Sequence, residues 1–128
     1  MKVPIQSPQA PGAIGPYSQA IRAGNIVFLS GQIPLDPVTL AIVPGDVAVQ
    51  TRQVMDNLGA VLVAAGLGFR NVVRTTIYLT DLANFTAVND VYGSYFVAPF
   101  PARATVQVSA LPRGALVEID AVAVDDPA

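Results

Sequence analysis

Proline and glycine interrupt this chain at short intervals, and their spacing limits the length of every helix and strand. The 128 residues include 11 prolines and 10 glycines, but no internal repeat, low-complexity tract or long linker. These residues mark turns and the ends of regular elements. A chain of this length is enough for one compact domain and too short for two ordinary ones. We therefore expect a single domain over residues 1–128.

Two segments carry the helical periodicity of apolar residues. The first begins at Asp46, a good N-cap, and ends at Gly66, a good C-terminal stop. The second begins at Asp81, and Pro99 prevents its continuation. The apolar stripe of this second helix comprises Leu82, Phe85, Val88, Tyr92 and Phe96. The sequence thus predicts two amphipathic helices.

Five other segments have the composition of β-strands, after an irregular start that reaches residues 15–16. Residues 17–22 and 26–29 flank a turn and predict a first hairpin, and residues 72–79 are rich in β-branched side chains. Residues 103–109 and 116–124 flank a turn at 111–114 and predict a second hairpin. The order β-β-α-β-α-β-β predicts an α+β fold, a mixed sheet with both helices on one face.

In the second hairpin, alternation divides the side chains between two faces. Around a turn centred on residues 112–113, Gln107 lies opposite Glu118 and Thr105 opposite Asp120. The polar side chains of both strands, Arg103 included, then share the face that the helices leave uncovered. A neighbouring subunit is a reasonable cover for that face, because it also carries apolar residues.

The composition is apolar for so small a domain, with 52% hydrophobic and 12% charged residues. A small domain has much surface for its volume, so one core cannot bury all of this apolar material. We expect a large face to be buried against other copies of the chain. With 7 basic residues, 9 acidic residues and a net charge of −2, the chain lacks the basic footprint of a nucleic-acid binder.

The chain contains 0 Cys and 0 His. This excludes thiolate nucleophiles, Ser-His-Asp triads and the common zinc and haem ligand sets, so we expect no metal site. The best remaining constellation is Arg103 with Glu118: arginine offers a planar fork of donors for a carboxylate, and Glu118 could deprotonate a water. A structural ion pair across the two strands is an equally good interpretation of the spacing.

The N-terminal residues MKVPIQSPQAPG lack the continuous apolar core of a signal peptide. No segment approaches the roughly 20 apolar residues that cross a bilayer. These features predict a cytoplasmic protein with no membrane partner.

Four segments carry a resemblance to a known family: GPYSQAI at 15–21, FLSGQIP at 28–34, AVNDVYGSYF at 87–96 and FPARATVQVSALPRGALVEIDAVAV at 100–124. They resemble the RidA (YjgF-type) family along nearly the whole chain, with the motifs in order. The resemblance implies a chorismate-mutase-like α+β subunit. It also implies a homotrimer with three sites in clefts between adjacent subunits.

The resemblance further implies a chemistry. Family members that retain the arginine of the PAR motif hydrolyse 2-aminoacrylate and related 2-imino acids to 2-oxo acids and ammonia. This is a 2-iminobutanoate/2-iminopropanoate deaminase activity, and it needs no cofactor. Some relatives have cysteine at the position of Thr105. The threonine excludes thiol chemistry in this chain and leaves a carboxylate–water mechanism intact. The implied roles are Arg103 gripping the substrate carboxylate, Glu118 activating water, and Tyr17, Ser30, Gly31 and the backbone of Thr105 lining the site.

Alternatives remain for residues and for function. Tyr17 could be an aromatic without a role, Ser30 could satisfy a backbone group, and Gly31 could serve a turn. Asn89 is expected to buttress the cleft rather than contact substrate. A chaperone-like or regulatory binding trimer is the non-enzymatic alternative. An endoribonuclease is a further one, against which the low charge and the absence of histidine argue.

Overall fold

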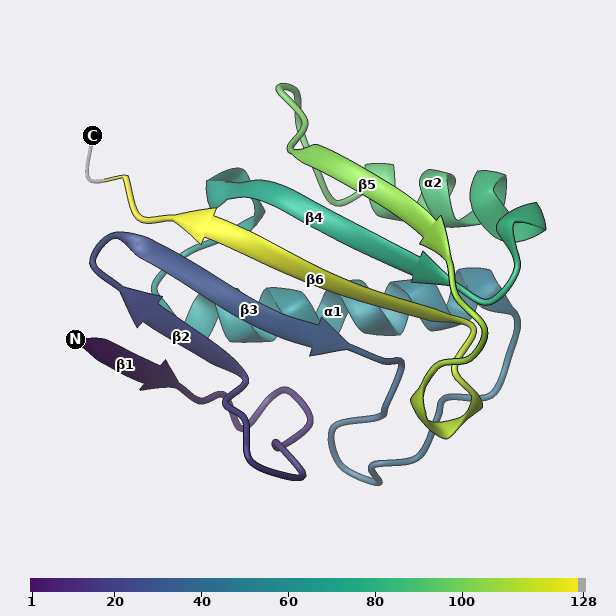
Figure 1. Ribbon diagram of the computed structural model, residues 1–128, viewed down its shortest axis with the longest axis horizontal. Helices are drawn as coiled ribbons and strands as arrows, with labels where there is room; N and C mark the ends of the chain where they lie inside the picture. The colour runs from purple at the N-terminus through teal and green to yellow at the C-terminus, as the bar shows by residue number, and fades with distance from the viewer. Residues whose placement is uncertain (127–128) are drawn as a thin grey trace.

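A six-stranded sheet carries two α-helices on one of its faces in the computed structural model, which describes residues 1–126 (Figure 1). The strands are β1 (Lys2–Ile5), β2 (Ala20–Ala23), β3 (Ile26–Gln32), β4 (Val72–Leu79), β5 (Ala102–Gln107) and β6 (Val117–Val124). The helices are α1 (Val47–Ala64) and α2 (Phe85–Gly93), with single 3-10 turns η1 (Phe69–Asn71), η2 (Leu82–Asn84) and η3 (Pro112–Gly114). The predicted α+β class, a mixed sheet with two helices on one face, is confirmed.

The longer helix, α1, begins and ends where the sequence predicts. The Asp46 side chain accepts a hydrogen bond from the backbone N–H of Val49 at 3.0 Å, which satisfies one of the free donors of the first turn. At the other end Gly66 has a φ of +77°, the left-handed conformation that favours glycine. The buried side of α1 contacts β6 and β3 and includes Val47, Val54, Met55, Leu58, Val61 and Leu62.

The second helix is shorter than predicted. Asp81 accepts a hydrogen bond from the backbone N–H of Ala83 at 2.9 Å, but it caps the 3-10 turn η2 and not an α-helix. Leu82–Asn84 form this tighter turn, so the α-helix itself starts only at Phe85. Phe96 of the predicted stripe lies beyond the helix, although its ring still packs 4.8 Å from that of Tyr92.

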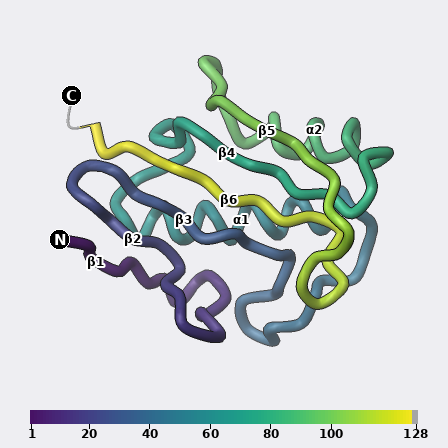
Figure 2. The backbone as a smooth tube through the Cα atoms, in the orientation of Figure 1, coloured from purple at the N-terminus to yellow at the C-terminus, as the bar shows by residue number. Residues whose placement is uncertain are grey.

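The strands lie in the order β1-β2-β3-β6-β4-β5. All neighbours are antiparallel except β4 and β5, which run parallel with Thr75 opposite Arg103. On its other side β4 pairs with β6, with Tyr78 opposite Glu118. Figure 2 traces this path: the chain leaves β4, passes through α2 and returns to the sheet edge as β5.

The predicted second hairpin is therefore wrong. Because β4 lies between β5 and β6, Gln107 is not opposite Glu118 and Thr105 is not opposite Asp120. A strand–helix–strand unit returns the second strand parallel to the first, which places β5 on the free edge of β4. The link from β5 to β6 then passes the end of β4, where the N–H of Val108 donates to the Leu79 carbonyl at 2.8 Å.

The two faces of the sheet differ as the β6 alternation predicts. Val117, Ile119, Ala121 and Ala123 are buried toward the helices. The residues between them point to the open face, which is the side of the sheet without helices. It carries Glu118, Asp120 and Val122 of β6, Phe28 of β3, and Thr76 and Tyr78 of β4. Phe28 is 49% exposed there.

The N-terminal segment contains a strand that the sequence did not indicate. β1 pairs antiparallel with β2 at the edge of the sheet. Pro4 is tolerated there because an edge strand pairs on one side only, so a missing backbone N–H need not cost a hydrogen bond. The first predicted hairpin is confirmed as β2–β3, but β2 starts at Ala20 instead of residue 17. Just before it, the buried Gln19 side chain accepts from the N–H of Ser7 at 2.6 Å and donates to the carbonyl of Pro11 at 2.8 Å. This amide fixes the loop that leads to residues 15–17.

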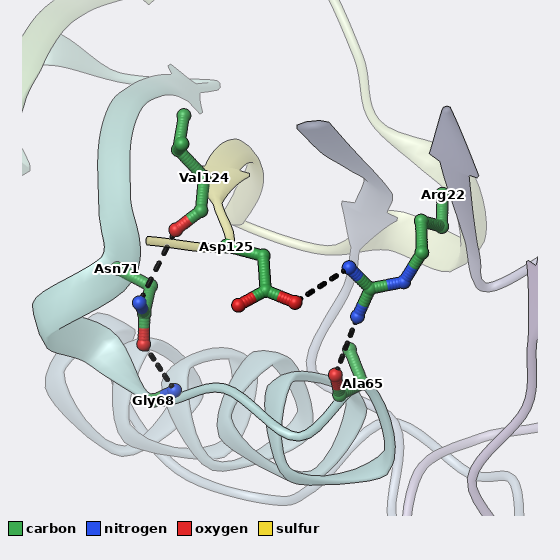
Figure 3. A network of polar contacts seen from close by, with 6 residues as sticks. All are labelled: Arg22, Ala65, Gly68, Asn71, Val124 and Asp125. Atoms are coloured by element: carbon green, nitrogen blue, oxygen red, sulfur yellow. Dashed lines mark hydrogen bonds and ion pairs between the residues drawn. The ribbon is translucent and has the colours of Figure 1, made fainter. Parts of the chain in front are cut away.

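A polar network fastens the end of α1 to the sheet (Figure 3). Arg22 of β2 donates to the carboxylate of Asp125 at 2.9 Å and to the carbonyl of Ala65, at the C-cap of α1, at 2.7 Å. Asn71 accepts from the N–H of Gly68 at 3.0 Å and donates to a carbonyl at the end of β6. Within residues 1–126, no helix is long and apolar enough to cross a membrane.

Candidate functional site

Arg103 lies at the start of β5 and points toward α2. Its Nη1 donates to Oδ1 of Asn89 at 2.8 Å. The guanidinium carbon lies 5.5 Å from the ring centre of Phe85 and 5.1 Å from that of Tyr92, within the range of cation–π attraction. The two rings and one amide hold the half-buried guanidinium in one orientation.

A cavity of about 370 Å³ opens in front of this guanidinium, lined by Asn89, Tyr92, Gly93, Phe100, Pro101 and Arg103. The ion pair found among residues 1–126 joins Arg22 to Asp125, and Arg103 has no carboxylate within 4.0 Å in that part of the chain. A partly buried guanidinium with unused donors is suited to a planar anion, which it can bind through two parallel hydrogen bonds.

Glu118 lies on the open face of β6, against Gly31 of β3. The β3–β6 register shifts between Leu29 and Gln32, where Ser30 and Gly31 form a bulge. A Cβ atom at Gly31 would overlap the Glu118 carboxylate and would lie 3.0 Å from its Cδ. Glycine therefore leaves the space in which this carboxylate lies.

The surroundings of Glu118 favour its protonated form. Burial raises the pKa of Glu118, and the negative charge of Asp120, two residues further along the same face, raises it further. A carboxylate with a raised pKa is a stronger base than a solvent-exposed one. Asp120 is itself held by the Tyr78 hydroxyl, which donates to its Oδ2 at 3.0 Å.

Tyr17 and Gly31 both line a second cavity of about 240 Å³. Tyr17 is 53% exposed, and the neighbouring loop is fixed by the Gln19 amide. The walls of this cavity are otherwise mostly apolar and come from the N-terminal loop, the end of β3 and η3: Pro11, Gly12, Ile14, Ile33, Leu35, Pro112 and Arg113.

Ser30 and Thr105 are not among the residues lining the two cavities. The Ser30 hydroxyl donates to the Ser18 carbonyl at 2.6 Å, and the Ser30 N–H donates to the Gln19 carbonyl at 3.0 Å. Its side chain thus supports the loop behind Tyr17. Thr105 follows Arg103 by two residues on the helix side of β5, and its buried Oγ1 has no hydrogen-bond partner among the described residues.

The structure does not bring Arg103 and Glu118 together within one chain. Parallel pairing with Thr75 places Arg103 on the helix side of the sheet, whereas Glu118 lies on the open face. Two strand spacings and three residues separate them, or about 14 Å between their Cα atoms. The expectation that they share a face is therefore wrong, and so is the ion pair across adjacent strands.

Two half-sites result. The arginine half-site comprises Arg103, Asn89, Phe85 and Tyr92, and the glutamate half-site comprises Glu118, Gly31 and Tyr17. Sequence reasoning assigned Phe85 and Tyr92 only to the apolar stripe of the helix. Their spacing of seven residues places them on one side of α2 together with Asn89, and this pattern could have indicated a lining for Arg103.

The fold defines a class of small α+β proteins with a six-stranded sheet and two helices, and comparison with known proteins identifies the family within this class. The family model described as Endoribonuclease L-PSP matches residues 7–125. The chain belongs to this family, which is the RidA (YjgF-type) family that its motifs resemble.

Curated relatives cover nearly the whole chain. Protein DfrA of Myxococcus xanthus is 66% identical over 122 residues, which are 94% of this chain and 93% of the relative. The 2-iminobutanoate/2-iminopropanoate deaminase of Capra hircus is 50% identical over 123 residues, 96% of this chain and 90% of the relative.

Solved structures share the fold. A Thermotoga maritima protein provisionally assigned as an endoribonuclease has a TM-score of 0.96 at 45% identity, covering 98% of this chain and 99% of its own. E. coli TdcF with bound serine has a TM-score of 0.93 at 43% identity, covering 97% and 99%.

Proposed function

We propose that the protein is a cofactor-independent hydrolytic deaminase of 2-imino acids and their enamine tautomers, such as 2-aminoacrylate, 2-iminopropanoate and 2-iminobutanoate. The observation that carries this proposal is the Arg103 guanidinium. Asn89 and two aromatic rings hold it beside a cavity, and it has no carboxylate partner within residues 1–126. Such a group suits the carboxylate that every 2-imino acid carries.

The two half-sites belong, in this account, to neighbouring subunits of a homotrimer. One chain offers Arg103 at the outer strand β5, and another offers Glu118 on its open face. The open face needs a cover, since it carries the half-exposed Phe28 and the partly exposed Val122. A second copy laid against it would bury these side chains and bring an Arg103 toward a Glu118.

The reaction then needs only orientation and proton transfer. Arg103 holds the substrate carboxylate through its two-pronged fork, which fixes the imine carbon relative to Glu118. Glu118 takes a proton from a water molecule, whose oxygen adds to the carbon of the N-protonated imine and gives a carbinolamine. Glu118 then passes this proton to the amino nitrogen, the carbon–nitrogen bond breaks as the hydroxyl oxygen becomes the carbonyl, and the hydroxyl proton is released to solvent, so the products are a 2-oxo acid and ammonia.

Two relatives support this substrate class. One is a 2-iminobutanoate/2-iminopropanoate deaminase at 50% identity, and E. coli TdcF binds serine, which carries a carboxylate and a nitrogen on the neighbouring carbon. A regulatory or chaperone-like trimer would instead use exposed apolar surface to bind its partner, without needing Arg103. An RNase fits less well, because the net charge is −2 and the chain contains 0 His.

Ammonia release tests the proposal. The protein is supplied with 2-imino acids generated by an amino acid oxidase or a pyridoxal-phosphate lyase, and 2-oxo acid formation is compared with the spontaneous rate. We expect a marked acceleration by a species that light scattering shows to have three times the chain mass. Spontaneous rates with the trimer present, together with suppression of aggregation of an unfolded client, would favour the chaperone-like alternative. Cleavage of a labelled RNA would favour the ribonuclease.

Replacing Gly31 by alanine is expected to lower turnover at least tenfold without unfolding the protein. The added methyl group would displace the Glu118 carboxylate, and displacement of a catalytic group by about 1 Å can cost as much as 100-fold. Gly68→Ala is the matched control, because a Cβ there meets no described atom within 4 Å. The measurement is kcat for both variants alongside their melting temperatures. Full activity of Gly31→Ala would show that the position of Glu118 does not matter.

A further inference from the structure

We propose that Asp120, fixed by Tyr78, is a positioning residue that sets the basicity of Glu118. This inference rests on the proposed imine hydrolysis. It concerns a second carboxylate that the mechanism above does not use.

The geometry joins three residues of the open face. Glu118 and Asp120 are two apart on β6, so both side chains leave the same face of the sheet. Tyr78 of β4 is directly opposite Glu118, yet its hydroxyl reaches diagonally to the Asp120 carboxylate at 3.0 Å. The hydrogen bond holds the charge of Asp120 at a fixed place beside Glu118.

Among the described residues of the same chain, the other neighbours of Glu118 leave this effect uncompensated. β3 presents Ser30 and Gly31, which carry no charge, and β4 presents Tyr78. Burial and the charge of Asp120 both raise the pKa of Glu118. The pKa of Tyr78 is raised by burial, by its hydrogen bond to Asp120 and by the charges of Asp120 and Glu118, so Tyr78 stays a protonated donor. In the trimer the neighbour's Arg103 adds a cation, which stays the same when Asp120 is replaced.

A fixed negative charge beside a general base has a defined consequence. It opposes ionisation of Glu118, which raises the proton affinity of the carboxylate and makes it a stronger base once ionised. At about 6 to 7 Å, the spacing of alternate residues along a strand, one like charge in a partly solvated setting shifts a titration by about 0.5 to 1 pH unit. Asp120 therefore lowers the reaction rate at acidic pH, where Glu118 is protonated, and raises it near neutral pH, where Glu118 is ionised.

The sequence supplies a direct reporter, because Glu118 is its one glutamate. In the intact protein labelled with [δ-¹³C]glutamate, a single side-chain carboxyl signal titrates. We expect its midpoint to fall by about 0.5 pH unit or more in Asp120→Asn, and by less in Tyr78→Phe, which frees Asp120 without removing its charge. The acid limb of kcat/KM should move by the same amount, and the plateau rate of Asp120→Asn should fall about twofold to fivefold.

Asp56→Asn is the matched control. Its carboxylate is also held by a tyrosine hydroxyl, that of Tyr95 at 2.7 Å, but it lies on α1 in the helix layer. This variant should leave the Glu118 midpoint unchanged. A Glu118 midpoint in Asp120→Asn equal to that of the wild type would overturn the inference, even with imine hydrolysis intact. Absence of imine hydrolysis in the wild type would instead refute the proposed function, whatever the carboxyl signal does.

Discussion

The Arg103→Lys variant is expected to keep its fold, while its rate of imine hydrolysis falls by about 100-fold or more. The guanidinium fork makes two parallel hydrogen bonds to a carboxylate, whereas an ammonium offers only a point charge. The Asn89 contact and the two flanking rings match a planar group, and a lysine would leave them partly unused. The imine carbon would then lose its fixed direction toward the water, and orientation accounts for much of the rate.

Arg103→Ala should abolish both turnover and binding of 2-oxo acids, because breaking a partly desolvated Arg–carboxylate pair costs several kcal/mol. The measurements are ammonia release, 2-oxo acid affinity by calorimetry and thermal melts for both variants. A purely structural Arg103 predicts the opposite pattern, a less stable assembly with near-normal specific activity. A trimeric Arg103→Lys that hydrolyses imines at the wild-type rate would contradict the carboxylate clamp.

Glu118→Gln is expected to lower turnover by about 10²–10⁴ while 2-oxo acid affinity changes little. Glutamine keeps the size of the side chain and removes the base. The same change should stabilise the unliganded protein at neutral pH. Because the fold raises the pKa of Glu118 above its ordinary value, the stability that this carboxyl contributes is present below its unfolded pKa and lost as the pH rises through its folded pKa.

Melting temperatures between pH 4 and pH 8 test the second half of that prediction. The Tm advantage of Glu118→Gln over the wild type should grow as the pH rises, and near pH 4 the two proteins should be nearly equal. Wild-type turnover by a folded Glu118→Gln trimer would exclude Glu118 as the group that activates water.

The local features of the fold could be predicted from the sequence because local rules decide them. The Asp46 cap, the Gly66 stop and the two-residue alternation of β6 depend on residues a few positions apart, and the structure confirms all three. Arg103 and Glu118 could be singled out only through the resemblance to the RidA family, because the absence of cysteine and histidine still leaves 7 basic and 9 acidic residues, and the sheet face that the predicted hairpin gave the pair is wrong.

The neighbours of β5 could not be predicted in this way. Alternation says which side chains share a face of a strand, but it does not say which strand lies alongside. The turn at 111–114 suggested a hairpin, while the true partner of β5 was set by the crossover through α2. Because of this different pairing, Arg103 lies on the helix side of the sheet and not on the open face, where the hairpin would have placed it. The closeness of Gly31 to Glu118 likewise depends on a bulge between strands that are far apart in the sequence.

Subunit mixing tests most directly the claim that one active site is built from half-sites of two chains. The Arg103→Ala and Glu118→Gln variants, each expected to be inactive alone, are unfolded together in equal amounts and refolded. Random assembly gives an intact Arg103 facing an intact Glu118 at about one interface in four, the product of two one-in-two chances. We expect the mixture to recover about a quarter of the wild-type rate of ammonia release, and either variant refolded alone to recover none. Mixed trimers, verified by mass spectrometry, that remain as inactive as their parents would contradict it.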